Sequence, residues 1–214
     1  MGFPLTTQDY IEWLKLAHLK IHGNGPYITE LDAATGDGDH WTNLNMGFEK
    51  LIAIADEFAP LSLSDAFKKI GMTMMSVIGG SGGVLYGSAY MEAAKVLKDV
   101  DVLTDQSLCD MLEAMLNAIM SRGKSEPGFK TMIDALYPAV QCYKTCIAEG
   151  KSEEETLELV KRAAKDGAQS TKDMEAVRGR AYYQANKGVG HLDPGAVTMS
   201  YQIETLMDYI STKQ

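Results

Sequence analysis

Cysteine and basic side chains are scarce in this sequence of 214 residues. Only 3 cysteines are present, an odd number without a CxxC pair, which argues against a disulfide framework and against a thiolate zinc site. Acidic residues outnumber basic ones by 29 to 20, and the formal net charge is -9. A surface that binds nucleic acid or anionic lipid needs clustered lysine and arginine, so we expect no nucleic-acid or membrane partner.

Long apolar runs are also missing. No uninterrupted apolar stretch reaches the roughly 20 residues that span a bilayer, and residues 1–4 lack the charged start and apolar core of a secretion signal. We therefore expect a cytoplasmic protein. Hydrophobic residues make up 45% of the chain and charged residues 23%, and no repeat or long linker divides it, so residues 1–214 are expected to form a single domain.

Apolar residues recur at intervals of three and four, which is the spacing of one helix face. Two-residue alternation flanked by hairpin turns is not found, which argues against a sheet. The sequence therefore predicts an all-α protein of about eight helices. The clearest helical stretches are residues 11–19, 63–74, 108–119, 132–147 and 157–164.

Several short patterns within these stretches have structural explanations. Ser62 or Ser64 can cap the helix that follows it, and Ser152 with Glu155 three residues later forms a capping-box pattern. Cys142 and Cys146 lie four residues apart, but without a neighbouring histidine or a further cysteine we interpret them as packing residues. These patterns predict structural roles in helix capping and packing, and no catalytic or metal-binding role.

Three carboxylates lie within eight residues in the first polar segment, residues 31–43: Asp32, Asp37 and Asp39. The glycines between them allow a tight turn in which the three can converge. Converging carboxylates repel one another unless a cation joins them, and magnesium prefers such hard oxygen ligands while leaving positions for phosphate oxygens. The segment therefore predicts a metal and phosphate site, with a solvated acidic loop that caps the next helix as the alternative.

Two other interpretations, a calcium EF-hand and a P-loop, fail because the sequence does not match the motifs that they require. A calcium EF-hand that starts at Asp37 would place Trp41 and Phe48 at ligand positions. A P-loop around Gly123-Lys124-Ser125 would need a glycine where Ala118 stands, and would need a strand where the preceding stretch is helical.

Three further features indicate contacts with phosphate. His40 and Asn43 can share the first turn of a helix, whose free amides favour an anion. Residues 79–87 form a glycine-rich segment whose backbone amides could cradle an oxyanion, although a tight helix-packing turn is an equal alternative. Arg178 and Arg180 could stabilise charge on a transferring phosphoryl group, or could form a surface charge patch.

Taken in order, these segments resemble the L subunit of dihydroxyacetone kinase over nearly the whole chain. The resemblance rests on these motifs: Leu31-Asp32, Gly36-Asp37-Gly38-Asp39-His40, Asn43, Gly47-Phe48, residues 79–87, Arg122-Gly123-Lys124, Lys130-Thr131-Met132, Gly179-Arg180-Ala181 and residues 190–195.

The resemblance implies an eight-helix antiparallel barrel that binds ADP or ATP at one end through two magnesium ions. Asp32, Asp37 and Asp39 would hold the metal ions, while Arg180 and His40 would be the catalytic residues. The nucleotide contacts would come from His40, Asn43, Ser81, Gly82, Gly123, Met132, Arg180, Asp193, Pro194 and Gly195.

The resemblance also implies partners. In such kinases a separate K subunit or domain holds the dihydroxyacetone, so an L subunit would be active only with its K subunit. The phosphoryl group comes either from exchangeable ATP or from ADP that a phosphotransferase-system M subunit rephosphorylates, and a free-standing L subunit favours the M-subunit route. Trp41, Gly82, Phe129 and Asn186-Lys187 depart from the family pattern, so a regulatory nucleotide-binding module that transfers no phosphate is the alternative.

Overall fold

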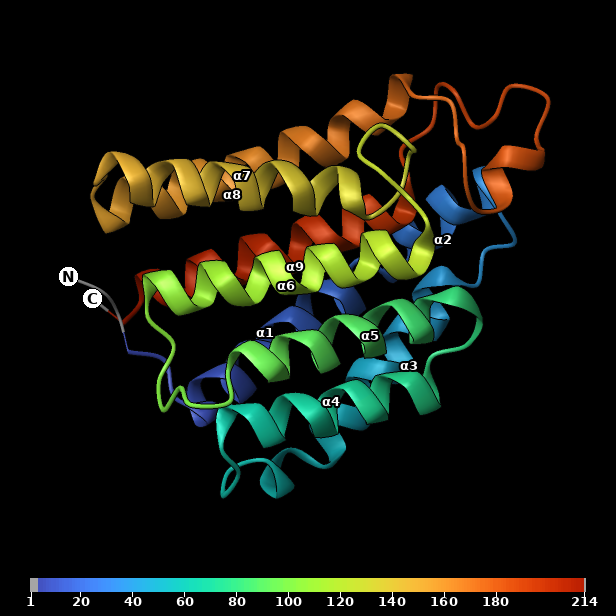
Figure 1. The fold of residues 1–214 in the computed structure, drawn as a ribbon. Coiled ribbons are helices and arrows are strands. Elements are labelled where there is room, and N and C mark those ends of the chain that lie inside the picture. Colours follow the sequence, from blue (N-terminus) through green and yellow to red (C-terminus); the bar gives the residue numbers. More distant parts are fainter. Residues whose placement is uncertain (1–3, 214) are drawn as a thin grey trace.

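The computed structural model describes residues 4–213, which contain nine α-helices and three short 3-10 helices (Figure 1). The prediction that no secretion signal is present rested largely on residues 1–3, which lie outside the described residues. The all-α prediction is confirmed. The α-helices are α1 (Thr7–Gly23), α2 (Gly25–Thr35), α3 (His40–Ala53), α4 (Leu63–Val77), α5 (Gly80–Val96), α6 (Asp105–Gly123), α7 (Ile133–Glu149), α8 (Glu153–Ser170) and α9 (Pro194–Ser211).

Eight of these helices close a ring. Helix α1 packs on α3, each helix from α3 to α8 packs on the next one in the chain, and α9 packs on α1. Successive helices in the ring run in opposite directions (Figure 1). The eight-helix antiparallel barrel is therefore present, and α2 is a ninth helix that packs against α3 and α9 at one end.

Helix α2 is separate because the chain breaks at Asn24. The Asn24 side chain donates from Nδ2 to the carbonyl oxygen of Lys20 at 2.7 Å, which satisfies one of the free carbonyls at the end of α1. Pro26 then stands in the first turn of α2, where its missing N–H and fixed φ suit a helix start but not a helix interior. The apolar periodicity did not reveal this break.

The helix starts follow the predicted caps in part. Ser62 caps α4 by accepting from the Asp65 amide at 3.2 Å. Ser152 likewise accepts from the Glu155 amide at 3.2 Å. The Glu155 carboxylate, however, accepts from Lys151 Nζ at 2.8 Å, so only the first half of the predicted capping box forms.

The ring encloses a continuous apolar core in which Phe48, Phe67, Tyr90 and Tyr143 are fully buried. The buried Tyr90 hydroxyl lies 3.1 Å from that of Tyr10, so these polar atoms satisfy one another. Within residues 4–213, no helix combines the length and the apolarity needed to cross a membrane.

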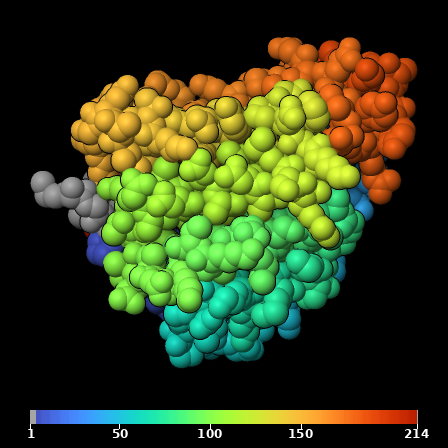
Figure 2. All heavy atoms as spheres, viewed as in Figure 1, coloured from blue at the N-terminus to red at the C-terminus, as the bar shows by residue number. Residues whose placement is uncertain are grey.

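The alternating directions bring the amino-terminal ends of α3, α5, α7 and α9 to one end of the barrel, away from the labelled termini (Figure 1). Each helix start presents backbone amides without intrahelical partners and a partial positive charge. The segment between α8 and α9 covers part of this end and forms the upper right corner in Figure 2. The fold thus gathers four anion-favouring helix starts beside the polar loops.

Candidate functional site

The three predicted carboxylates converge at this end of the barrel. Asp32 lies in the last turn of α2, and Asp37 and Asp39 lie in the loop before α3. One carboxylate oxygen from each can be chosen so that the three atoms all lie within 4.8 Å of one another. Asp32 is buried and the other two are exposed, so the cluster opens to solvent on one side. Three acidic oxygens with an open side fit a hard divalent cation such as magnesium.

The backbone around Asp32 fixes its carboxylate. Oδ2 of Asp32 accepts from the His40 amide at 2.9 Å. On the other side, a Cβ added to Gly36 would lie 2.6 Å from Asp32 Oδ1, closer than any unstrained contact. Gly38 has a φ of 77°, which favours glycine, so the loop needs this residue type at two positions.

We expect Gly36→Ala to weaken magnesium-dependent nucleotide binding by roughly 10–100-fold, because the added methyl group pushes the Asp32 carboxylate out of place. Calorimetric titration with ADP and magnesium measures the effect. Gly23→Ala is the matched control, because a Cβ at Gly23 meets nothing within 4 Å. Equal affinities for the two variants would contradict the positioning role of Gly36.

His40 and Asn43 occupy the first turn of α3, as predicted, and face different neighbours. His40 Nε2 lies 2.9 Å from Thr198 Oγ1 of α9. Burial lowers the pKa of His40, although the charges of Asp32 and Asp39 oppose the shift. The Asn43 amide faces the start of α5, since a Cβ at Gly79 would lie 2.9 Å from Asn43 Oδ1.

Arg180 completes the carboxylate cluster. Its Nη2 lies 2.6 Å from Asp37 Oδ2. The Arg180 side chain is 66% exposed, so it can move when another anion arrives. The sequence suggested that Arg180 stabilises charge but did not reveal this partner.

The glycine-rich segment begins α5, with Gly79 as its N-cap and Gly80 at a φ of 63°. Ser81 is exposed and Gly82 is half-buried in the first turn, where backbone amides are free. Gly83 packs so closely that an added Cβ would lie 2.3 Å from the Ile78 carbonyl oxygen. The segment is therefore a tight packing turn that also presents amides at the site.

The loop between α6 and α7 is held by Asp134 and Lys130. The Asp134 carboxylate accepts from the amides of Gly128 at 2.5 Å and Thr131 at 2.7 Å. Lys130 is buried and donates from Nζ to the carbonyls of Thr171 and His191. These bonds tie the loop to the segment before α9.

Asp193 caps α9, with its Oδ2 accepting from the Ala196 amide at 2.7 Å, and Pro194 follows at the first helical position. Gly195 lies against Met132, the N-cap residue of α7, because an added Cβ would be 3.6 Å from the Met132 amide nitrogen. The predicted residues Met132 and Asp193 to Gly195 therefore meet. Gly123 ends α6, where an added Cβ would lie 3.3 Å from Leu85.

Burial raises the pKa of Asp193 from 3.8 to about 7. The folded chain therefore keeps this proton where the unfolded chain loses it, so the parent protein loses stability as the pH rises from about 4 to about 7. Asp193→Asn keeps the cap but cannot ionise. In urea titrations without metal or nucleotide, we expect the Asp193→Asn variant to gain stability relative to the parent protein as the pH rises from about 4 to about 7. A difference in unfolding free energy that does not change with pH would contradict the raised pKa of Asp193.

Comparison with known proteins agrees with this arrangement. Residues 34–208 match the DAK2 domain family. The chain belongs to this family. It is 33% identical to the ADP-binding subunit DhaL of the PEP-dependent dihydroxyacetone kinase of Escherichia coli, covering 94% of this chain and 96% of that subunit. It is 36% identical to the corresponding subunit of kinase 1 of Listeria innocua, covering 92% of this chain and 93% of that subunit. The resemblance to the L subunit is confirmed.

A solved structure shares the DAK2-family fold. The dihydroxyacetone kinase of C. freundii in complex with AMP-PNP and Mg2+ superposes with a TM-score of 0.71 at 26% identity, covering 92% of this chain. This chain spans about a third of that kinase, since it covers 33% of its length.

Two departures from the family pattern have local structural roles in this DAK2 domain. The Trp41 ring packs on Gly25, and its Nε1 donates to the Ile21 carbonyl at 3.2 Å, so the side chain covers the break between α1 and α2. Asn186 holds the turn before Gly190, because its Oδ1 accepts from the Gly188 amide at 3.2 Å and its Nδ2 donates to the Val189 carbonyl at 3.0 Å.

Sequence reasoning missed three residues that organise the DAK2-family site: Thr198, Lys130 and Asp134. Thr198 lies 158 positions from the histidine that it contacts, so no local pattern could pair them. Lys130 belongs to the Lys130-Thr131-Met132 motif, but its place between Phe129 and Thr131 gives no sign that its side chain is buried. Asp134 resembled an ordinary acidic residue in a first helical turn.

Proposed function

We propose that residues 1–214 form the nucleotide-binding L subunit of a dihydroxyacetone-type kinase. The terminal phosphoryl group of a magnesium-bound adenine nucleotide passes to dihydroxyacetone, or to a related short ketose, held on a separate K subunit. The convergence of Asp32, Asp37 and Asp39 beside four helix starts carries the proposal. Acidic metal ligands next to anion-favouring amides suit a metal with a polyphosphate.

Each part of the site has a proposed role. Asp32, Asp37 and Asp39 hold two magnesium ions, which when bound would neutralise phosphate charge. His40, Asn43, Ser81 and Gly82 contact the phosphates from the starts of α3 and α5. The remaining nucleotide contacts come from Gly123 at the end of α6, and from Met132 and the Asp193 to Gly195 turn, which meet where α7 and α9 begin.

Arg180 and His40 are the proposed catalytic residues. The exposed Arg180 guanidinium leaves Asp37 and pairs with the transferring phosphoryl group, where it stabilises the charge that develops. His40 stays fixed by Thr198 and by the Asp32 carboxylate that accepts from its amide, so its ring is positioned beside the phosphates. Catalysis in this arrangement is mainly positioning and charge stabilisation.

The proposed phosphoryl donor is ADP that is rephosphorylated in place by a phosphotransferase-system M subunit in the cytoplasm. Its support is that the two bacterial relatives are named as ADP-binding subunits of PEP-dependent kinases and match this chain over nearly their whole length. Exchangeable ATP is the second route. A regulatory module without phosphoryl transfer is the competing function, favoured by the departures at Trp41, Gly82, Phe129 and Asn186-Lys187.

Two measurements test the proposal. Native mass spectrometry of the purified chain should show retained ADP with magnesium for the M-subunit route, and an empty site for exchangeable ATP. Reconstitution with the K subunit, dihydroxyacetone and either ATP or the phosphotransferase components should produce a sugar phosphate. Tight nucleotide binding without product under both regimes would support the regulatory module instead.

A further inference from the structure

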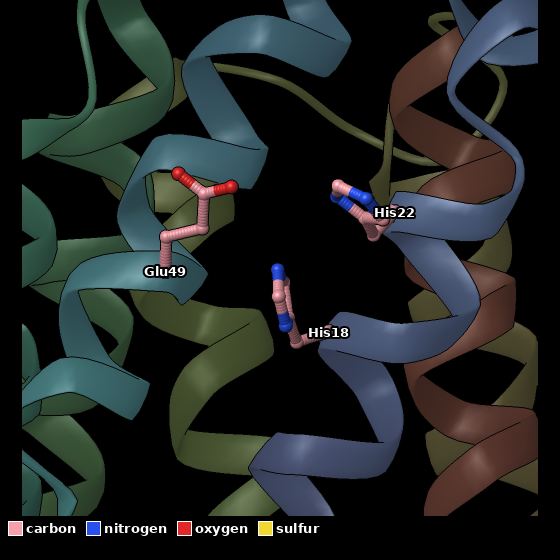
Figure 3. Close-up of side chains that lie close together, drawn as sticks. All are labelled: His18, His22 and Glu49. Carbon is pink, nitrogen blue, oxygen red and sulfur yellow. The ribbon is translucent and has the colours of Figure 1, made fainter.

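A second group of potential metal ligands lies on the outer side of α1 and α3. His18 and His22 come from α1, and Glu49 comes from α3, with their side chains facing a common space (Figure 3). One ligand atom from each residue lies within 4.8 Å of the others. None of these residues belongs to the carboxylate cluster.

The ligand types and their spacing suit a transition metal. Residues four apart on a helix share one face, so the two imidazoles form a chelating pair. Imidazole with one carboxylate is a ligand set of zinc and of similar divalent ions, whereas magnesium prefers oxygen ligands throughout. An ion at the centre of the three atoms would lie at most about 2.8 Å from each, and small side-chain rotations would shorten this to the 2.0–2.2 Å of zinc ligands.

Asn45 already orients two of the three ligands. Its Nδ2 donates to Glu49 Oε1 at 2.8 Å, so its Oδ1 faces His22 Nδ1 at 3.2 Å. A carboxamide oxygen only accepts, so Nδ1 of His22 carries the proton and Nε2 keeps a lone pair for a metal. Metal-binding histidines commonly donate their other ring N–H in this way, and the buried Asn45 would be the supporting residue.

The third ligand has an unsatisfied atom. Nε2 of His18 is buried and has no hydrogen-bond partner among the described residues. Buried polar atoms in native proteins are nearly always paired, so this nitrogen calls for an explanation.

We propose that His18, His22 and Glu49 bind one divalent transition-metal ion, with zinc as the best fit and water completing its coordination. The ion ties α1 to α3. Because α3 begins with His40 and Asn43, the metal would stabilise the helix that presents these residues to the nucleotide site. The ion shares no ligand with the carboxylate cluster and does not replace magnesium there.

Cobalt titration of the untagged, chelator-stripped chain tests the site, with magnesium in excess to fill the carboxylate cluster. We expect one cobalt ion per chain, with the visible absorption of four- or five-coordinate cobalt, displacement by zinc, and a higher melting temperature with zinc. His22→Ala and Glu49→Gln should each weaken binding at least about 10-fold, since each removes a ligand. Both positions are exposed, so both variants should fold.

Matched controls distinguish this site from others. Glu30→Gln, at an exposed position of α2, and Asp37→Asn, in the carboxylate cluster, should both bind cobalt as the parent chain does. A loss of magnesium binding at the carboxylate cluster would therefore be distinguishable from a loss of the histidine site. His18→Gln provides a second removal within α1. An unchanged spectrum of hydrated cobalt, or equal affinities for the parent chain and the His22→Ala and Glu49→Gln variants, would overturn the proposal.

Discussion

Replacing Asp37 with asparagine is expected to lower the affinity for magnesium and ADP by at least about 100-fold. The substitution removes one of three converging ligands and a full negative charge, and even the loss of a supporting residue typically costs 10–100-fold in metal affinity. Calorimetric titration with ADP at fixed magnesium measures the change.

Without metal, the same substitution is not expected to weaken ADP binding. Asp37 pairs with Arg180, so Asp37→Asn releases a guanidinium that can contact phosphate, and metal-free ADP binding should stay equal or become tighter. Asp56→Asn, at an exposed position between α3 and α4, is the matched control and should leave both affinities unchanged. An Asp37→Asn chain that binds magnesium and ADP within about twofold of the parent would contradict the metal assignment.

Arg180→Ala is expected to lower turnover by roughly 10³-fold in the reconstituted kinase, the lower end of the range for an arginine that stabilises phosphoryl transfer. Because the guanidinium acts on charge that develops in the transition state, the affinity for magnesium and ADP should change much less than turnover. Single-turnover transfer from loaded nucleotide to dihydroxyacetone separates the two effects.

Arg178 provides the matched control for Arg180. It lies two residues earlier and donates from Nε to the Lys124 carbonyl at 2.9 Å, so it holds the loop after α6 and does not reach the carboxylate cluster. Arg178→Ala should keep nearly full turnover. If the two substitutions had equal effects, Arg180 would belong to a general charge patch, as the alternative sequence interpretation held.

Much of the fold was predictable because it depends on local periodicity. Stretches such as residues 108–119 and 157–164 lie within α6 and α8, where one apolar face packs into the core. The convergence of the three carboxylates was also predictable, since Asp32, Asp37 and Asp39 are close in the chain and glycines bend the loop between them. These features need only short-range information.

The remainder depends on topology. Arg180 meets Asp37, and Lys130 reaches the His191 carbonyl, only because the antiparallel ring places the loops after α2, α6 and α8 at one end. The break between α1 and α2 was missed because a proline in a first helical turn does not disturb the apolar pattern. Neither the packing partner of Trp41 nor the clustering of His18 with Glu49 could be found from spacing alone.

The central claim is that Asp32, Asp37 and Asp39 share metal with the phosphates of an adenine nucleotide. The most direct test is a crystal grown with ADP and manganese in place of magnesium, measured at the manganese absorption edge. The account predicts anomalous peaks between these carboxylates and the phosphate oxygens, with Arg180 turned toward the nucleotide. An ordered nucleotide without such peaks, and with Asp37 still paired to Arg180, would contradict it.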